Sequence, residues 1–470
     1  MDGTSGRTRQ GGHLPAPVSV PELAEWRAAL AGVDRDVSDA ERIDQLRALE
    51  ELKSAACAAQ ARIAVDLDDS QRREQRAAGV RPERLGQGVG SQVALARRES
   101  PHRGGRLLGL GKALVGEMPH TYQALRSGAL SEWRACLLVR ESACLSVADR
   151  SAFDAELAAD PTLFEGVGDR ELVARAKRVA YRLDAAALVR RAAHAESERC
   201  VSLRPAPDTM SYLTGLLPVA QGVAVLAALR QAADTARSQG DGRSRGQVMA
   251  DTLVERVTGQ GATASVPVEI QLVMTDRTLL AGDDEPAHVN GYGTVPAGWA
   301  RRLVDQRLGE GGGRRERLWL RRLYTSPSSG QLVAMDSRRR TVPPGLRRFV
   351  VARDQTCRTP WCDAPIRHID HVTPYSQSGT TSAEDLQGYC EACNYAKQAP
   401  GWRSRAGPDA LEPADGAQQH GHVVRTTTPT GHRYDSAAPA LPGHRRTPGR
   451  SGGRRDDSPV ERQMARYLAA

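Results

Sequence analysis

Aromatic residues are scarce in this chain of 470 residues. They make up 4% of the sequence, although 40% of its residues are hydrophobic. Because large rings are so few, any hydrophobic core must be built mainly from leucine, valine and alanine. The length leaves room for two or three domains.

Lysine is scarcer still. The 65 basic residues include only four lysines, and all the others are arginine; the lysines are Lys53, Lys112, Lys177 and Lys397. Together with abundant alanine and glycine, this bias indicates a GC-rich genome, so arginine richness is a weaker functional signal here than usual. The net charge of +9 and the isoelectric point near 9.3 nevertheless fit a polyanionic partner.

Long apolar runs are also missing. No stretch reaches the roughly 18 apolar residues that a membrane span needs. The opening residues, MDGTSGRTRQGGHLPAP, lack the apolar core of a secretory signal. We therefore predict a cytoplasmic protein without a membrane partner, whose eight cysteines are thiols or metal ligands rather than disulfides.

The positive charge is concentrated in one segment. Residues 299–348 contain 13 arginines against four acidic residues, so this segment alone carries a charge of +9. It precedes a cluster of cysteines, which is where a clamp for nucleic acid would lie. A solvated linker is the alternative interpretation.

Apolar residues recur at helical spacing through the first half of the chain, as Ile43, Leu46, Leu49 and Leu52 do. The two ends are rich in glycine, proline and polar residues, which is typical of disorder. The pattern predicts four segments: a disordered N-terminus (1–20), a mostly helical domain (21–336), a second domain (337–403) and a disordered basic tail (404–470).

A small α+β segment is expected at the end of the helical domain. RCVSLRPAPDTMSYLTGLLP is typical of a strand pair, VPVEIQLVMTD of a strand, and residues 326–330 of a hairpin turn. In the tail, SPVERQMARYLA predicts a short helix. Four cysteines without pair spacing are predicted to be small buried apolar residues of the helices: Cys57, Cys136, Cys144 and Cys200.

The other four cysteines fall into two pairs of metal-ligand spacing. Cys357 and Cys362 form C-x4-C, and Cys390 and Cys393 form C-x2-C. Four thiolates suit a closed tetrahedral zinc site, which can stabilise a small domain without a large core. Such a zinc ion is structural, because no position is open for water. A redox C-x2-C pair is a weaker alternative, because no thioredoxin-like pattern surrounds it.

Oxygen and imidazole ligands lie between and after the cysteine pairs. RHIDHV contains Asp370 and His371, and Asn394 and Lys397 follow the last cysteine. Oxygen ligands suit Mg²⁺ or a similar hard cation, and a neutral imidazole beside it can take a proton from water. Adjacent residues of a regular strand point to opposite faces, so Asp370 and His371 can share a site only at a bulge or a strand end.

The window RRFVVARDQTCRTPWCDAPIRHIDHVTPYSQSGTTSAEDLQGYCEACNYAKQAPGW resembles an HNH endonuclease domain of the ββα-metal type with a four-cysteine zinc site. The preceding region resembles the DUF222 domain (13E12 repeat family), which often precedes HNH domains in actinobacterial proteins. The expected fold is therefore a mainly α N-terminal domain with a small α+β segment, followed by a ββα-metal domain held together by the zinc site of the four cysteines.

The resemblance implies roles for particular residues. His371 matches the general base that activates water, and Asp370 matches the acidic metal ligand before it. Asn394 stands at the position of the last metal ligand, and Lys397 matches a frequent lysine that contacts phosphate. Because Asn394 and Lys397 are three residues apart, they share one face of a helix.

One position departs from the family. The middle asparagine, which orients the base histidine, usually precedes leucine, but here the pair is Asp385 and Leu386. An aspartate can still accept a hydrogen bond from an imidazole N–H, although it adds negative charge near the phosphate. Alternatively, Asp385 pairs with Ser382 at the start of a helix.

These observations predict a divalent-metal-dependent endonuclease that hydrolyses DNA, with catalytic Mg²⁺ or a similar ion, structural Zn²⁺ and no small-molecule cofactor. One alternative is a zinc-stabilised DNA-binding protein whose catalytic site has decayed, which Asp385 favours. Another makes the DUF222-like region a protein-interaction module and the HNH domain auxiliary. The sequence leaves the oligomeric state open.

Overall fold

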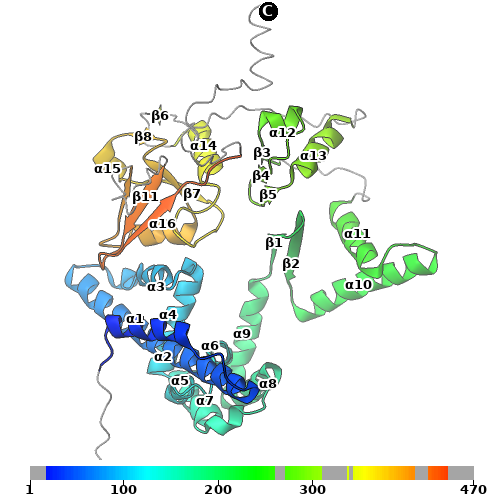
Figure 1. Cartoon of the computed structure of the whole chain (residues 1–470). Helices are drawn as coiled ribbons and strands as arrows, with labels where there is room; N and C mark the ends of the chain where they lie inside the picture. The colour runs from blue at the N-terminus through cyan, green and yellow to red at the C-terminus, as the bar shows by residue number, and fades with distance from the viewer. Residues whose placement is uncertain (1–16, 260–269, 310–335, 338–341, 408–421, 443–470) are drawn as a thin grey trace, which may run out of the picture.

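A helical N-terminal part and a smaller α+β C-terminal part lie side by side (Figure 1). The computed structural model describes residues 17–259, 270–309, 336–337, 342–407 and 422–442. None of the helices in these ranges is long and apolar enough to cross a membrane. The predicted fold class is confirmed: a mostly helical N-terminal region with small sheets precedes an HNH-type region with a four-cysteine cluster.

The helical part contains three short 3₁₀ helices (Leu30–Gly32, Pro82–Arg84 and Pro161–Phe164) and the α-helices α1 (Val20–Ala29), α2 (Asp39–Ala77), α3 (Val89–Arg97), α4 (Pro101–Gly116), α5 (Pro119–Arg126), α6 (Glu132–Ser142), α7 (Val147–Ala158), α8 (Asp169–Leu183) and α9 (Ala185–Ser197).

Helix α2 is the central helix of the helical part. It begins at a capping box, in which the Ser38 hydroxyl and the Glu41 carboxylate each accept a backbone N–H of the other residue. Its 39 residues span about 58 Å at 1.5 Å per residue. Glycines of α4 let neighbouring helices approach closely, because a Cβ at Gly111 would lie 2.8 Å from the Ala61 carbonyl oxygen of α2. Leucine, alanine and Phe153 fill the core between α2 and α4–α8.

The N-terminal half of α2 is a helix, as predicted, but its apolar residues are not buried. Ile43 is 58% exposed and Leu46 is 64% exposed. The buried face of α2 begins further along, at Ser54 and Ala58. The spacing therefore predicted the helix correctly but does not report which stretch of it contacts the core.

Residues after α9 form a strand pair and a helical hairpin, followed by a small three-stranded sheet. The strand pair is predicted correctly and is antiparallel. The strand expected in VPVEIQLVMTD is observed only at Leu272–Val273, and residues 260–269 lie outside the described ranges. The elements are β1 (Cys200–Ala206), β2 (Met210–Leu216), α10 (Val219–Ser238), α11 (Arg245–Thr258), β3 (Leu272–Val273), α12 (Asp276–Leu280), β4 (Ala287–Val289), β5 (Gly293–Val295) and α13 (Ala297–Gly309).

The C-terminal part is a ββα unit with additional strands around it. Strand β7 pairs antiparallel with β9, so that His371 lies opposite Leu386, and α16 follows directly. The elements are β6 (Asp336–Ser337), α14 (Pro344–Asp354), β7 (His368–His371), α15 (Tyr375–Ser378), β8 (Thr381–Ser382), β9 (Leu386–Tyr389), α16 (Glu391–Lys397), β10 (Arg403–Ala406), β11 (Val423–Thr427) and β12 (Arg433–Ala437).

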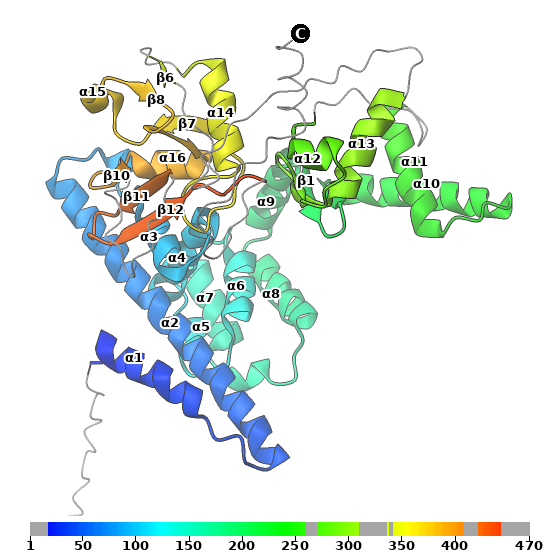
Figure 2. The ribbon, with the colours of Figure 1, turned by 45° about the horizontal axis from the view of Figure 1, so that its top comes forward.

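The prediction of a disordered tail over 404–470 is wrong for its first part. Strands β10, β11 and β12 form an antiparallel sheet in that order. This sheet lies beside α16 and close to α3 (Figure 2). Val423 and Val424 are 1% exposed, so this segment adds to the core of the C-terminal part.

The prediction for the four unpaired cysteines needs correction. Cys57 and Cys136 are only partly buried against the helical core, and burial raises the pKa of both thiols. Cys144 is partly buried in a turn, and Cys200 is exposed in β1 rather than buried in a helix. Their side chains therefore lie at the boundary of the core or outside it.

Other predictions lie wholly or largely outside the described residues. These are the disordered N-terminus, most of the basic segment 299–348, the hairpin at 326–330 and the helix in SPVERQMARYLA.

Candidate zinc and nuclease sites

The four clustered cysteines come from two elements. Cys357 and Cys362 lie in the loop after α14, whereas Cys390 caps the N-terminus of α16 and Cys393 lies in its first turn. Their Sγ atoms all lie within 4.8 Å of one another, and Sγ of Cys362 is 3.6 Å from Sγ of both Cys390 and Cys393. Tetrahedral zinc with Zn–S bonds of about 2.3 Å needs sulfurs about 3.8 Å apart. The donor set therefore fits a structural zinc ion.

The thiols of this cluster share protons unevenly. Hydrogen bonds from Cys357, Cys362 and Cys393 lower the pKa of Cys390 far below its ordinary value. The same contacts raise the pKa of Cys362 and Cys393, with the hydrogen bond to Cys357 as the largest cause. Negative charge is thus stabilised among sulfurs that are at most 9% exposed, which is the environment a divalent cation neutralises.

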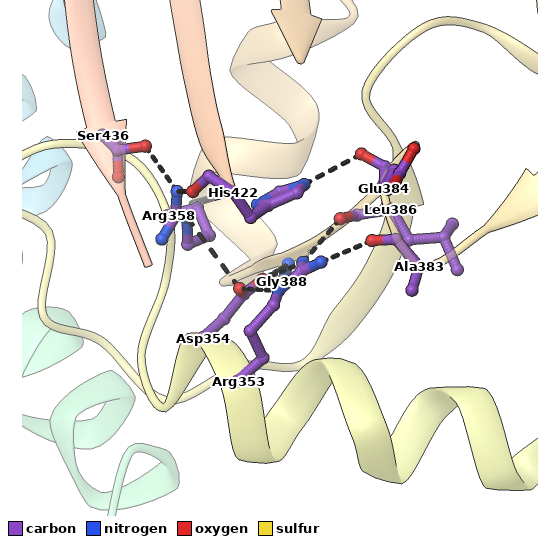
Figure 3. Close-up of polar contacts among 9 residues, drawn as sticks. All are labelled: Arg353, Asp354, Arg358, Ala383, Glu384, Leu386, Gly388, His422 and Ser436. Carbon is purple, nitrogen blue, oxygen red and sulfur yellow. Dashed lines mark hydrogen bonds and ion pairs between the residues drawn. The ribbon is translucent and has the colours of Figure 1, made fainter. Parts of the chain in front are cut away.

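A buried network of charged groups supports the loop that carries the first cysteine pair (Figure 3). Arg353 is 2% exposed, donates to the Asp354 carboxylate at 2.7 Å and reaches the Leu386 carbonyl at 2.7 Å. Asp354 in turn accepts the Gly388 N–H at 2.8 Å. These bonds fix the end of α14 against β9.

The same network holds the C-terminal sheet. Arg358, one residue after Cys357, donates to the carbonyl oxygens of His422 and Ser436. His422 Nε2 lies 2.9 Å from the Glu384 carbonyl oxygen, to which it donates. Burial, and after it the positive charge of Arg353, lower the pKa of His422 to about 4, so the imidazole is neutral at pH 7. Sequence reasoning missed these residues, because their partners are backbone carbonyls distant in the chain.

His371 lies at the end of β7, which is one of the two conditions under which it can share a site with Asp370. Its Nε2 is 2.9 Å from the hydroxyl of Thr381, a residue of β8 with no exposed surface. The Tyr375 ring packs edge-on against the imidazole, with centroids 5.4 Å apart. The ring is therefore held by two side chains that the sequence did not single out.

Asp370 and Lys397 contact each other across the ββα unit. The Lys397 ammonium is 2.7 Å from the Asp370 carboxylate and also donates to the His371 carbonyl. The contact joins the end of β7 to the last turn of α16. Asn394 lies one turn earlier on α16, and its Oδ1 is buried without a hydrogen-bond partner among the described residues. An orphaned buried amide oxygen is costly unless a ligand satisfies it, and a hard cation would do so.

Asp385 contacts the backbone rather than the imidazole. Its Oδ1 accepts the Thr373 N–H at 3.0 Å, and its carbonyl accepts the Val372 N–H at 2.7 Å. Asp385 N also donates to the Ser382 hydroxyl at 3.1 Å, so the predicted contact exists, but β8 and β9 flank it and no helix begins there. Asp385 thus fixes the segment directly after His371.

Helix α16 also contacts the helical part. The Gln87 side chain donates to the Tyr395 carbonyl at 2.8 Å, and a Cβ at Gly88 would lie 2.6 Å from Nε1 of Trp402. At the other end of the C-terminal sheet, the Thr430 hydroxyl donates to Gln92 at 3.2 Å. The helix that carries Asn394 and Lys397 therefore rests on the segment that leads into α3 and on α4.

Known families match both parts. The HNH endonuclease family matches residues 355–399, which include all four clustered cysteines and the ββα unit. The "Domain of unknown function (DUF222)" family matches residues 43–354, about two thirds of the chain. The chain belongs to the DUF222 family and carries an HNH endonuclease domain after it.

Curated relatives are similar over a short stretch. Uncharacterized proteins of Mycobacterium bovis and of two strains of Mycobacterium tuberculosis are 33% identical over 75 residues, which is 16% of this chain and 16% of each relative. The match thus spans about a sixth of the relatives' length. No solved structure matches the chain.

Proposed function

We propose that this protein is a metal-dependent endonuclease that hydrolyses phosphodiester bonds in DNA. The observation that carries the proposal is the buried Oδ1 of Asn394, which has no partner among the described residues. It lies on the helix whose Lys397 contacts Asp370 and the backbone of His371. An HNH domain implies a nucleic-acid substrate. The net charge of +9 favours the same partner.

The side chains of this site have different roles in the proposed reaction. His371 accepts the proton of the attacking water as the general base. Thr381 holds the Nε2–H tautomer by accepting its hydrogen bond, which leaves Nδ1 as the basic nitrogen. Asp385 fixes the backbone after His371, and Lys397 keeps a positive charge beside the phosphate.

Two metal sites are proposed. Asp370 and Asn394 would hold Mg²⁺ or a similar divalent ion, which when bound supplies positive charge to polarise the phosphate and stabilise the leaving oxygen. Cys357, Cys362, Cys390 and Cys393 would hold Zn²⁺, which keeps the ββα unit folded.

A plasmid-nicking assay tests this function. Wild type and His371→Ala, both with verified zinc content, are incubated with supercoiled plasmid and Mg²⁺, Mn²⁺ or EDTA. We expect cleavage by the wild type that needs the added ion and is lost in His371→Ala. Cleavage that survives the His371 substitution would contradict the assignment of the base.

Asp385 favours a second function, a DNA-binding protein whose catalytic site has decayed. The half-buried carboxylate adds negative charge where the family has a neutral amide. If zinc-loaded wild type binds DNA but no ion supports cleavage, this second function is preferred. Restoration of cleavage by Asp385→Asn would then identify the decayed position.

A further inference from the structure

The C-terminal sheet has one buried and one exposed face. Ser404, Val424 and Ser436 share the face toward the ββα unit, whereas the opposite face carries exposed arginines and, at its end, the buried Val423. On this inner side the Tyr434 ring packs edge-on against Trp361, beside Cys362, with centroids 6.0 Å apart. The outer face is therefore fixed relative to the zinc site.

Arginines dominate the outer face. Residues directly opposite each other in paired strands point to the same side, so the register defines two rows across the sheet. One row is Arg405, Arg425 and Asp435, and the other is Arg403, Thr427 and Arg433. Four arginines thus face one acid on a surface three strands wide.

Among the residues that the structure describes, Arg425 alone of these four arginines has an ion-pair partner. Arg425 forms a bidentate pair with Asp435, at 2.7 and 2.9 Å. Arg403, Arg405 and Arg433 are exposed, and none of them has an ion-pair partner within the described ranges. Arg405 lies directly opposite Arg425, so two guanidinium groups stand side by side on this face, and the carboxylate of Asp435 pairs with Arg425.

The position of the sheet links this charge to the candidate nuclease site. His422, next to the start of β11, donates to the carbonyl of Glu384, the neighbour of Asp385. The β11–β12 turn ends on α3 through Thr430. The sheet therefore extends from the loop beside the proposed base to the helical part, as the order of elements in Figure 2 also shows.

We propose that this outer face, with Arg403, Arg405 and Arg433 as its free cations, binds the phosphate backbone of DNA. The proposal rests on the proposed function and adds a binding surface outside residues 355–399, which the HNH family matches. Guanidinium groups suit phosphate oxygens because they present paired N–H donors. The contacts are independent of sequence, since they involve phosphates and not base edges.

The salt dependence of DNA binding tests the surface. Binding of a 30-base-pair duplex is measured between about 50 and 200 mM salt, with the full-length chain carrying His371→Ala, verified zinc and no added divalent ion. Each lost phosphate contact lowers the slope of log K against log salt by about 0.9. We expect R403Q/R405Q/R433Q to lower the slope by about 2 to 3.

Two further variants make the result specific. R170Q/R237Q/R256Q removes the same charge from exposed positions of α8, α10 and α11 and is expected to change the slope by less than about 1. R403K/R405K/R433K keeps the charge and is expected to keep the wild-type slope. Equal slopes for R403Q/R405Q/R433Q and R170Q/R237Q/R256Q overturn the proposal while leaving the nuclease function intact. Binding without any salt dependence overturns both.

Discussion

Asp385 is the residue at which this chain departs from its family, and the structure gives its side chain a structural contact. Because only Oδ1 is used, an asparagine can make the same bond to the Thr373 N–H. Asp385→Asn should therefore fold normally and remove a negative charge near the substrate phosphate. We expect a single-turnover nicking rate between unchanged and about tenfold faster, since tenfold corresponds to about 1.4 kcal/mol of barrier. A large loss of rate would show that the carboxylate has its own catalytic role.

Thr381 is predicted to act on the rate through His371. Thr381→Val removes the hydroxyl from Nε2 but keeps the size of a side chain with no exposed surface. We expect kcat to fall about tenfold or more with little change in KM, because a positioned base contributes about 10²- to 10⁴-fold. The alkaline plateau of the pH–rate profile should fall as well. Thr381→Ser is the matched control and should restore most of the rate; equal rates in all three proteins would exclude the positioning role.

At the scale of single residues, the sequence predicts site residues that lie at a fixed ligand spacing. It misses contacts between residues whose separation in the chain follows no such pattern. The two cysteine pairs place four sulfurs together because ligand spacing is a local constraint. Thr381 lies ten residues after His371 among similar polar residues, so only the folded positions of β7 and β8 bring its hydroxyl to the imidazole.

Helix α16 depends on the zinc cluster for its start. Cys390 is its N-cap, and the Cys393 N–H donates to the Cys390 sulfur at 3.4 Å. Cys390→Ser should lose zinc and unfold the C-terminal part, because the zinc ion would join the start of α16 to the loop that carries Cys357 and Cys362. Zinc content by mass spectrometry and a thermal melt would measure this. Cys200→Ser, at an exposed cysteine, is the control and should change neither. Full zinc content in the Cys390 variant would contradict the four-thiolate site.

The contact by which His422 attaches the C-terminal sheet predicts that the stability of the protein depends on pH. His422 titrates near pH 6.5 when unfolded and near 4 when folded, because burial disfavours its charged form. As pH falls from about 6.5 towards 4, the unfolded state gains a proton that the folded state does not. The free energy of unfolding should therefore decrease, by up to about 3 kcal/mol. His422→Gln should show a shallower decrease between pH 6.5 and 5 at equal zinc content. If the free energy of unfolding falls equally steeply with pH in both proteins, His422 does not cause the decrease.

The elements show what periodicity can and cannot report. Strands β11 and β12 were missed although VVRTT and RYDSA carry the β-branched and aromatic residues of strands, because glycine-, proline- and arginine-rich sequence surrounds them. Conversely, Ile43 and Leu46 have helical spacing and lie in a helix, yet remain exposed. Spacing determines the period of an element, whereas burial depends on which distant segment packs against it.

The whole molecule is held together where α3 meets the C-terminal part. Gly88 has a φ of +85°, and a Cβ there would lie 2.6 Å from Trp402 Nε1 and 3.0 Å from Ala399 Cβ. An alanine at this position must therefore push the indole, and with it the end of α16, away from the helical part. We expect Gly88→Ala to loosen this contact and to lower the rate of DNA cleavage, because α16 carries Asn394 and Lys397.

Gly79→Ala separates this effect from backbone strain. Gly79 has a φ of +75° with nothing within 4 Å of its would-be Cβ, so it shares the left-handed conformation without the clash. Each substitution should cost about 1 kcal/mol for the strained backbone. Only Gly88→Ala should also raise amide hydrogen exchange in α16 and in the β11–β12 turn that contacts Gln92. If both variants exchange alike, the helical part does not hold the nuclease helix in place, and the two parts act independently.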